Sequence, residues 1–170
     1  KRYGLSLMPV LFDYMVADGV SEEGGVAVGE RPDLLTTKKQ ALLDLLGEFV
    51  GTYGTDSSIY AWDVMNEPEY VTAIGQVALK TFISEVVTTI HQHAEQMVTV
   101  GSRNYLDVQK WKGIGLDLYQ VHAYSQMEDL PRTSELLLDK PVIVGELSAL
   151  DVQEKLRVVE QKGYIGAIFW

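Results

Sequence analysis

Two glutamates follow apolar segments of the sequence, at positions where a carboxyl group could do chemistry. Glu67 lies in the segment WDVMNEP and Glu146 follows the run PVIVG, and neither has a cation directly beside it. If the ends of these segments meet, repulsion between the carboxylates keeps a proton on one while the other stays ionised. A proton donor that faces an ionised carboxylate about 5–5.5 Å away is the pair that retaining glycoside hydrolysis requires.

Five other polar or aromatic residues stand at or near the ends of segments with strand character: Asp13, Asn66, His122, Tyr124 and Trp170. Parallel strands of an α/β fold end at one face, and the active sites of such folds lie there. The sequence leaves structural alternatives open for most of them. Asp13 could cap a turn, the histidine could be satisfied by backbone inside the core, Tyr124 could be ordinary packing, and the tryptophan could be buried.

Segments with strand and helix character alternate along the chain, which indicates a parallel sheet. The strand candidates are 4–12, 59–66, 97–100, 116–123, 141–145 and 164–170. Apolar spacing predicts helices over 38–53 and 79–94, and a short one over 134–138. The stretch 16–33, rich in Gly and Glu, predicts a long loop with a functional or mobile character.

Two helices carry more specific predictions. The core face of the helix over 38–53 is expected to hold Leu42, Leu45, Leu46, Phe49 and Tyr53. Asp151 and Glu154 form a capping box for the last helix. That helix is expected to bury Val152, Leu156 and Val159.

Six strands could form an open doubly wound sheet or most of a barrel. No Gly-rich phosphate loop follows any strand candidate, which weighs against nucleotide binding. His91 and His93 point apart on a helix, so a solvated face is expected there instead of a metal site. Asp63 is expected to be a buried structural acid. Glu22 and Glu23 are expected to lie in a solvated loop.

Composition narrows the functional classes. The 170 residues carry 14 basic and 24 acidic side chains, a net charge of −10, which argues against nucleic-acid binding and suits a neutral substrate. The absence of cysteine excludes disulfides and thiolate metal sites. No apolar stretch approaches the roughly 18 residues of a membrane span. The sequence starts without Met and both ends lie in apolar runs, so both ends look cut, and no signal peptide is visible.

The motifs Asn66-Glu67-Pro68, His122-Ala123-Tyr124, Gly145-Glu146 and the terminal Trp170 together resemble glycoside hydrolase clan A, most closely its family 5 of cellulases and mannanases. Their order and spacing resemble strands four, six, seven and eight of that clan's (β/α)8 barrel. The resemblance covers essentially the whole chain. It implies a parallel TIM-type barrel that is incomplete here, with about six strands in one partial domain over 1–170.

The resemblance also implies roles for the residues at the strand ends. Glu67 would be the general acid/base, Glu146 the nucleophile, and Asn66 a hydrogen-bond partner of the sugar hydroxyl at C2. Alternation along a strand places neighbouring residues on opposite faces, so Asn66 and Glu67 reach one pocket only if the strand twists or ends there.

Three further residues have supporting roles by the same resemblance. Tyr124 would bond Glu146 and keep it ionised, His122 would line the substrate side near Glu67, and Trp170 would stack on the sugar in the cleaved subsite. The expected substrate is a neutral β-linked oligo- or polysaccharide. No metal or organic cofactor is expected, and the resemblance favours a secreted or periplasmic protein.

Strands one and two and the last helix of the family's barrel have no counterpart in the sequence, and neither does the arginine that ends strand two and bonds the nucleophile. Asp63 is a candidate partner for such an arginine. Two alternatives therefore stay open: a non-catalytic carbohydrate-binding or scaffold protein on the same barrel, and an inactive fragment of a larger enzyme. Bare sheet edges would also favour self-association.

Overall fold

A computed structural model describes residues 5–18, 31–124 and 127–170, so the pair 22–23 and most of the predicted loop lie outside the described residues. The described part of the loop forms two short helical segments, α1 (Met15–Asp18) and a 3₁₀ turn (Pro32–Leu35). Six parallel strands form one sheet: β1 (Val10–Asp13), β2 (Ala61–Asn66), β3 (Met97–Ser102), β4 (Tyr119–His122), β5 (Val142–Leu147) and β6 (Ala167–Phe169).

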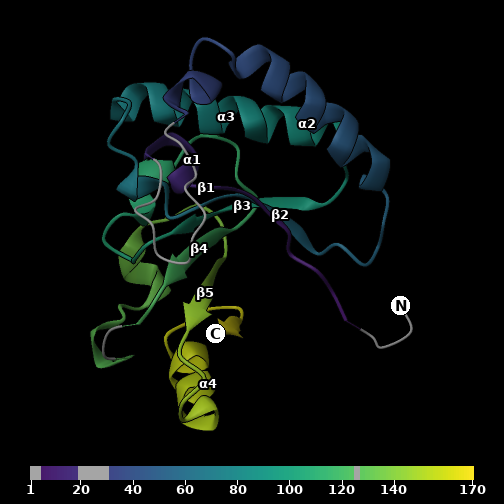
Figure 1. The fold of residues 1–170 in the computed structure, drawn as a ribbon. Helices are drawn as coiled ribbons and strands as arrows, with labels where there is room; N and C mark the ends of the chain where they lie inside the picture. The colour runs from purple at the N-terminus through teal and green to yellow at the C-terminus, as the bar shows by residue number, and fades with distance from the viewer. Residues whose placement is uncertain (1–4, 19–30, 125–126) are drawn as a thin grey trace, which may run out of the picture.

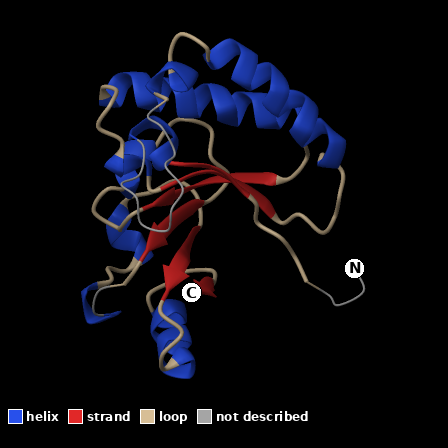
Figure 2. Ribbon diagram, in the orientation of Figure 1, coloured by secondary structure: helices blue, strands red, loops and turns tan. Residues whose placement is uncertain are grey.

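Longer helices alternate with these strands and cover the outer side of the sheet. They are α2 (Lys39–Tyr53), α3 (Gln76–His93) and α4 (Val152–Gln161). Figure 1 shows α2 and α3 side by side over the first strands, and Figure 2 shows the strands turning about one another. Shorter 3₁₀ turns span Pro68–Tyr70, Val108–Trp111, Met127–Asp129 and Thr133–Leu136.

The strand order in the sheet is the same as the order in the chain, without the reversal of a doubly wound sheet. Successive right-handed crossovers then place every helix on the same side, as in a barrel wall. The prediction of an incomplete (β/α)8 barrel is confirmed, because β1 and β6 are both edge strands among the described residues.

The inner side of the sheet is built in layers. Ala61, Leu118 and Ile143 form a small buried apolar layer. Two positions further along their strands come Asp63, Gln120 and Gly145, so alternation stacks a polar layer on the apolar one. The much larger core between sheet and helices buries residues such as Trp62, Val64, Phe82, Ile83 and Val86.

The predicted core face of α2 is partly wrong. Leu46 is buried as expected, but Leu45, Phe49 and Tyr53 are 63%, 47% and 43% exposed. The buried face runs instead through Leu43, Leu46, Gly47 and Val50. A methyl group on Gly47 would come within 3.1 Å of the His93 ring, so the helices approach each other at a glycine that a hydrophobic pattern does not register.

Two further predictions of local structure are corrected. The first strand is shorter than 4–12, because Pro9 has no N–H for the ladder, and only an isolated bridge joins Leu7 to Ile59 before β1 begins. The capping box at Asp151 is absent: this residue has a left-handed backbone with φ of 55°, and its side chain makes no cap bond. Of the side chains expected in the core, only Val159 is fully buried in α4.

The two unpaired edges border a cavity of about 980 Å³. Leu7 and Val10 on one side and Ile168 and Trp170 on the other are between 40% and 80% exposed. Within the described residues, no helix is long and apolar enough to cross a membrane.

We propose that the 170-residue chain, expressed alone, associates through these edges. Unpaired backbone groups in an apolar β edge recruit another chain, so light scattering after size exclusion is expected to show a concentration-dependent dimer or larger species. Val10→Lys combined with Ile168→Lys places charges on both edges and is expected to shift the equilibrium towards monomer. A monomer at every concentration, with unchanged edges, would contradict this prediction.

Candidate functional site

The chain turns sharply at Glu67, directly after β2 ends at Asn66. Glu67 has φ of 44° and ψ of 51°, a left-handed conformation that non-glycine residues seldom adopt, and its N–H donates to Gly101 O at 2.7 Å. This turn removes Glu67 from the strict alternation of the strand. It explains how the side chains of consecutive residues can both lie at the carboxyl end of the sheet.

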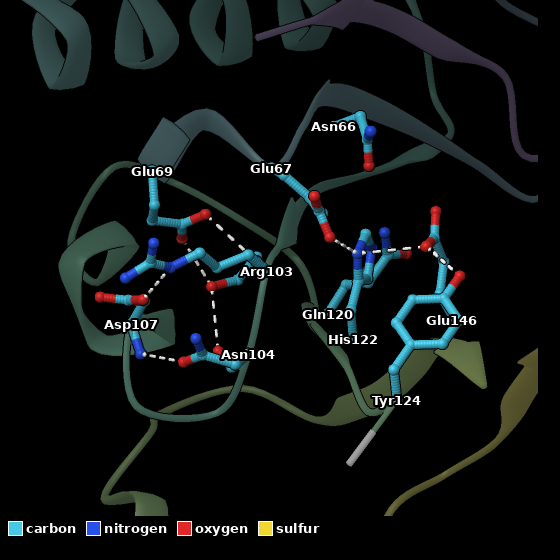
Figure 3. Close-up of polar contacts among 12 residues, drawn as sticks. Asn66, Glu67, Glu69, Arg103, Asn104, Asp107, Gln120, His122, Tyr124 and Glu146 are labelled. Atoms are coloured by element: carbon cyan, nitrogen blue, oxygen red, sulfur yellow. Dashed lines mark hydrogen bonds and ion pairs between the residues drawn. The ribbon is translucent and has the colours of Figure 1, made fainter. Parts of the chain in front are cut away.

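Glu67 and Glu146 approach each other beside a buried histidine (Figure 3). Nδ1 of His122 lies 2.8 Å from Oε1 of Glu67 and 3.5 Å from Oε2 of Glu146. One carboxylate oxygen from each glutamate and a ring nitrogen of the histidine lie within 4.8 Å of one another. The expected spacing of about 5 Å between the carboxyl groups therefore agrees with the structure, and both side chains keep contact with solvent at 18% and 27% exposed.

Tyr124 holds the other side of Glu146. Its hydroxyl donates to Oε2 of Glu146 at 2.5 Å. Burial, this hydrogen bond and the charges of Glu146 and Glu67 raise the pKa of Tyr124 well above its usual value. The phenol therefore stays protonated and remains a donor to Glu146.

Asn66 is oriented by Asp13, at the end of the neighbouring strand. Its Nδ2 donates to Oδ2 of Asp13 at 2.8 Å, and Oδ1 of Asp13 accepts from the backbone N–H of Met15 at 2.9 Å. Asp13 therefore caps the turn after its strand, as one alternative from the sequence had it, and its other oxygen also orients Asn66.

His122 is buried beside Glu67, whereas Trp170 is exposed at the end of the chain. The ring of His122 is 1% exposed, so it supports Glu67 from within the barrel instead of lining a surface. Trp170 is 80% exposed, which excludes the reading of a core residue. It lines the large cavity together with Glu146 and Asn66, while its backbone N–H donates to Leu147 O at 2.8 Å.

A buried polar layer lies beneath the two glutamates. Asp63 and Gln120 are each 2% exposed, and Nε2 of Gln120 donates to Oδ2 of Asp63 at 2.7 Å. The contact passes over Gly101 of β3, whose N–H donates to Oδ1 of Asp63 at 3.0 Å. Gly145 is equally required, because a Cβ there would lie 2.3 Å from the Gln120 side chain.

The electrostatics of this layer follow from burial. Desolvation raises the pKa of Asp63 to about 7, hydrogen bonds from Gln120 and the backbone oppose that rise, and the charge of Glu146 adds to it. The structure gives Asp63 no arginine partner among the described residues; Gln120 takes that place. Oε1 of Gln120 is buried without a partner in the same part of the chain.

Asp63→Asn is expected to stabilise the protein above neutral pH. The unfolded state ionises this carboxyl near pH 4 and the folded state near pH 7, so stability falls as the pH rises between these values. The difference between these two pKa values costs the folded wild type as much as ~4 kcal/mol of stability above neutral pH, and the amide, which does not ionise, avoids this cost. The Gln120 amide must turn over in the variant so that its oxygen accepts from the new amide, because its Nε2 now faces Oδ2 of Asp63.

Denaturant unfolding at pH 4 and pH 8 measures this difference. The variant and the wild type should have the same free energy of unfolding near pH 4, and the variant should have the larger one at pH 8. Asp44→Asn, at an exposed position on α2, is the matched control and should show no such pH dependence. Loss of stability by Asp63→Asn at pH 8 would show that Asp63 is held ionised in the folded protein.

Glu69 anchors the loop that follows Glu67 and was not anticipated from the sequence. It is 8% exposed and accepts from Ser102 Oγ at 2.6 Å, Trp111 Nε1 at 2.6 Å and the backbone N–H of Arg103 at 3.1 Å. This network ties the loops after β2 and β3 together (Figure 3) and fixes the chain on which Glu67 stands. Gln120 was missed as well, although it lies two positions before His122 on the same face of its strand.

Glu67, His122 and Glu146 also offer the ligand atoms that a divalent cation would need. The same atoms already form the hydrogen bonds to His122 and Tyr124 described above, so their arrangement is explained by those contacts. His91 and His93 are exposed, and their ring nitrogens bond Asp117 and the Thr89 carbonyl respectively.

Comparison with solved structures identifies the fold. The chain superposes on the β-mannanase of the blue mussel Mytilus edulis with a TM-score of 0.77 and 20% identity, over 99% of this chain and 63% of that one. It also matches a glycosyl hydrolase family 2 member from Bacteroides cellulosilyticus (TM-score 0.67, 16% identity, 99% of this chain and 20% of that one). Endo-glycoceramidase II from Rhodococcus sp. follows with a TM-score of 0.56 and 17% identity, over 82% of this chain and 41% of that one.

No family model and no curated protein sequence matches the chain. At the identities found, the structural likeness establishes the fold: the chain has the barrel architecture of glycoside hydrolases and spans less than two thirds of the mussel enzyme's length. The resemblance stated from the sequence motifs is confirmed at the level of this architecture.

Proposed function

We propose that the protein is a retaining β-glycoside hydrolase that acts on a neutral β-linked glycan, with Glu67 as acid/base and Glu146 as nucleophile. The observation that carries this proposal is the approach of the two carboxylates to within 4.8 Å at the carboxyl end of the sheet. Inverting enzymes hold the two groups roughly 6.5–9.5 Å apart to admit a water molecule, so the shorter spacing supports a double displacement.

In the first step, an oxygen of Glu146 forms an ester bond with the anomeric carbon while the glycosidic C–O bond breaks. Glu67 gives its proton to the departing oxygen. In the second step, Glu67 takes a proton from water, the water oxygen bonds to the anomeric carbon, and Glu146 leaves as a carboxylate. The configuration at the anomeric carbon is retained because it inverts twice.

The surrounding contacts support the roles of Glu67 as acid/base and Glu146 as nucleophile. Tyr124 donates to Glu146, and a hydrogen bond to the charged form stabilises the ionised nucleophile. Glu67 contacts a histidine that is itself buried, which restrains the carboxyl group that must deliver the proton. Asn66, fixed by Asp13, is the candidate partner of the hydroxyl at C2, and the exposed Trp170 ring is the candidate platform for the sugar.

A neutral substrate fits the charge of the cavity. Its lining includes the carboxylates of Asp13 and Glu146, the buried and only partly ionised Asp63, and no lysine, arginine or histidine among the described residues. Negative lining groups and a net charge of −10 repel anionic sugars.

A second candidate is carbohydrate binding without turnover, and the unclosed sheet is the observation that favours it. Assays of the full chain on chromogenic β-glycosides and on β-glucan and mannan polymers separate the two. Proton NMR of the first product should show the β anomer before mutarotation. Binding without any hydrolysis would favour the second candidate, and an α anomer would contradict retention.

A further inference from the structure

Three side chains at the ends of adjacent strands contact one another in a row beside Glu67. Tyr14 follows β1, Tyr70 lies in the turn after β2, and Arg103 follows β3. The rings of Tyr14 and Tyr70 are 5.2 Å apart, and the Arg103 guanidinium carbon lies 5.2 Å from the centre of the Tyr70 ring. We call these three residues the tyrosine–arginine surface.

The guanidinium of this surface is held in place. Nε of Arg103 donates to Oδ2 of Asp107 at 2.6 Å, while Lys110 pairs with the other oxygen of Asp107 at 2.5 Å. The backbone N–H of Arg103 is bonded to the buried Glu69. The terminal nitrogens of Arg103 have no hydrogen-bond partner among the described residues, and the side chain is 35% exposed. Planar donors fixed in this way are available to a ligand.

The surface lies on the Glu67 side of the site. The backbone N–H of Tyr70 donates to the Glu67 carbonyl at 3.0 Å, and the charge of Glu67 acts on the Tyr14 phenol. Figure 3 shows Arg103 and Glu146 on opposite sides of Glu67. In the proposed reaction Glu67 protonates the departing oxygen, so the departing part of a glycan lies on the side of this surface.

We propose that the tyrosine–arginine surface binds the leaving-group sugars of a β-linked oligosaccharide, and that the protein therefore prefers chains of sugars to simple aryl glycosides. This inference rests on the proposed function. The Tyr70 ring, which is 46% exposed, suits the C–H face of a sugar, and the Arg103 guanidinium suits its hydroxyls.

The test compares two substrates that differ only on the leaving side. Tyr70→Ala and Arg103→Ala are expected to lower kcat/KM for mannotetraose or cellotetraose by about 10-fold or more, the effect of losing one good contact. Hydrolysis of the corresponding nitrophenyl glycoside, which has no leaving-group sugar, should change by less than about 3-fold. Tyr70→Phe keeps the ring and should lie near the wild type on both substrates, as should Leu106→Ala, a 76% exposed neighbour of the same loop.

An equal loss of kcat/KM on both substrates, or no loss of kcat/KM on either, would overturn the inference. Calorimetric binding of the same tetraose to the Glu146→Gln protein gives a readout that is independent of turnover. Adding Tyr70→Ala should weaken that binding by about 10-fold, and unchanged binding would overturn the inference as well. If the wild type binds the tetraose through Tyr70 but hydrolyses no substrate, the proposed hydrolase function is rejected. The assignment of the tyrosine–arginine surface as a sugar-binding surface then still stands.

Discussion

Glu146→Gln is expected to lower kcat by about four to six orders of magnitude, the range seen when a nucleophile is removed from an enzyme. The amide has nearly the same shape as the carboxylate and can still accept the hydrogen bond from Tyr124. It is a poor nucleophile and carries no charge to stabilise the oxocarbenium-like transition state, so the glycosyl ester does not form.

Steady-state assays on the best substrate of the full chain measure this loss, and circular dichroism checks that the variant folds. Glu154→Gln, on the exposed face of α4 shortly after the same strand, is the matched control and should keep wild-type activity. A Glu146→Gln protein that retains a tenth or more of the wild-type kcat would remove Glu146 from the role of nucleophile.

Glu67→Gln is expected to separate substrates by their leaving groups. Departure of a sugar needs a proton from Glu67, so hydrolysis of an oligosaccharide should fall by about 10²–10⁴-fold, the usual contribution of general acid catalysis. An activated aryl leaving group departs without protonation, so bond cleavage in such a glycoside should change far less.

Single-turnover and steady-state rates on the two substrate types test this prediction. Glu69→Gln is not a suitable control, since Glu69 is a buried anchor of the loop; exposed Glu154→Gln serves here too. A loss of the same size on both leaving groups would assign Glu67 a structural role.

Much of the site was predictable because it depends on strand ends. In a parallel sheet the carboxyl ends of strands meet at one face, so Glu67, His122, Tyr124 and Glu146 came together from sequence position alone. The alternation of strands and helices predicted a parallel sheet, whereas the barrel order of its strands was implied by the resemblance of the motifs. The exposure of Trp170 was less predictable, since the sequence did not decide between a buried core residue and an exposed stacking platform for a sugar.

The remaining features depend on contacts between distant parts of the chain. The pairing of Asp63 with Gln120 requires that Gly101 lie between them without a side chain, which no local pattern reveals. The buried face of α2 depends on where α3 packs, and the left-handed turns at Glu67 and Asp151 override alternation and capping statistics. The local propensities of the residues do not predict any of these features, because tertiary packing determines them.

The central claim is that Glu146 forms a covalent bond to the sugar, and trapping that bond tests it most directly. A fluorosugar inactivator of the preferred glycone slows both steps and lets the glycosyl-enzyme accumulate, so mass spectrometry can locate the adduct. The account predicts one added sugar per chain, on the peptide that contains Glu146, and none in the Glu146→Gln protein. An active enzyme that forms no adduct and gives inverted product, or one labelled on Glu67, would contradict it.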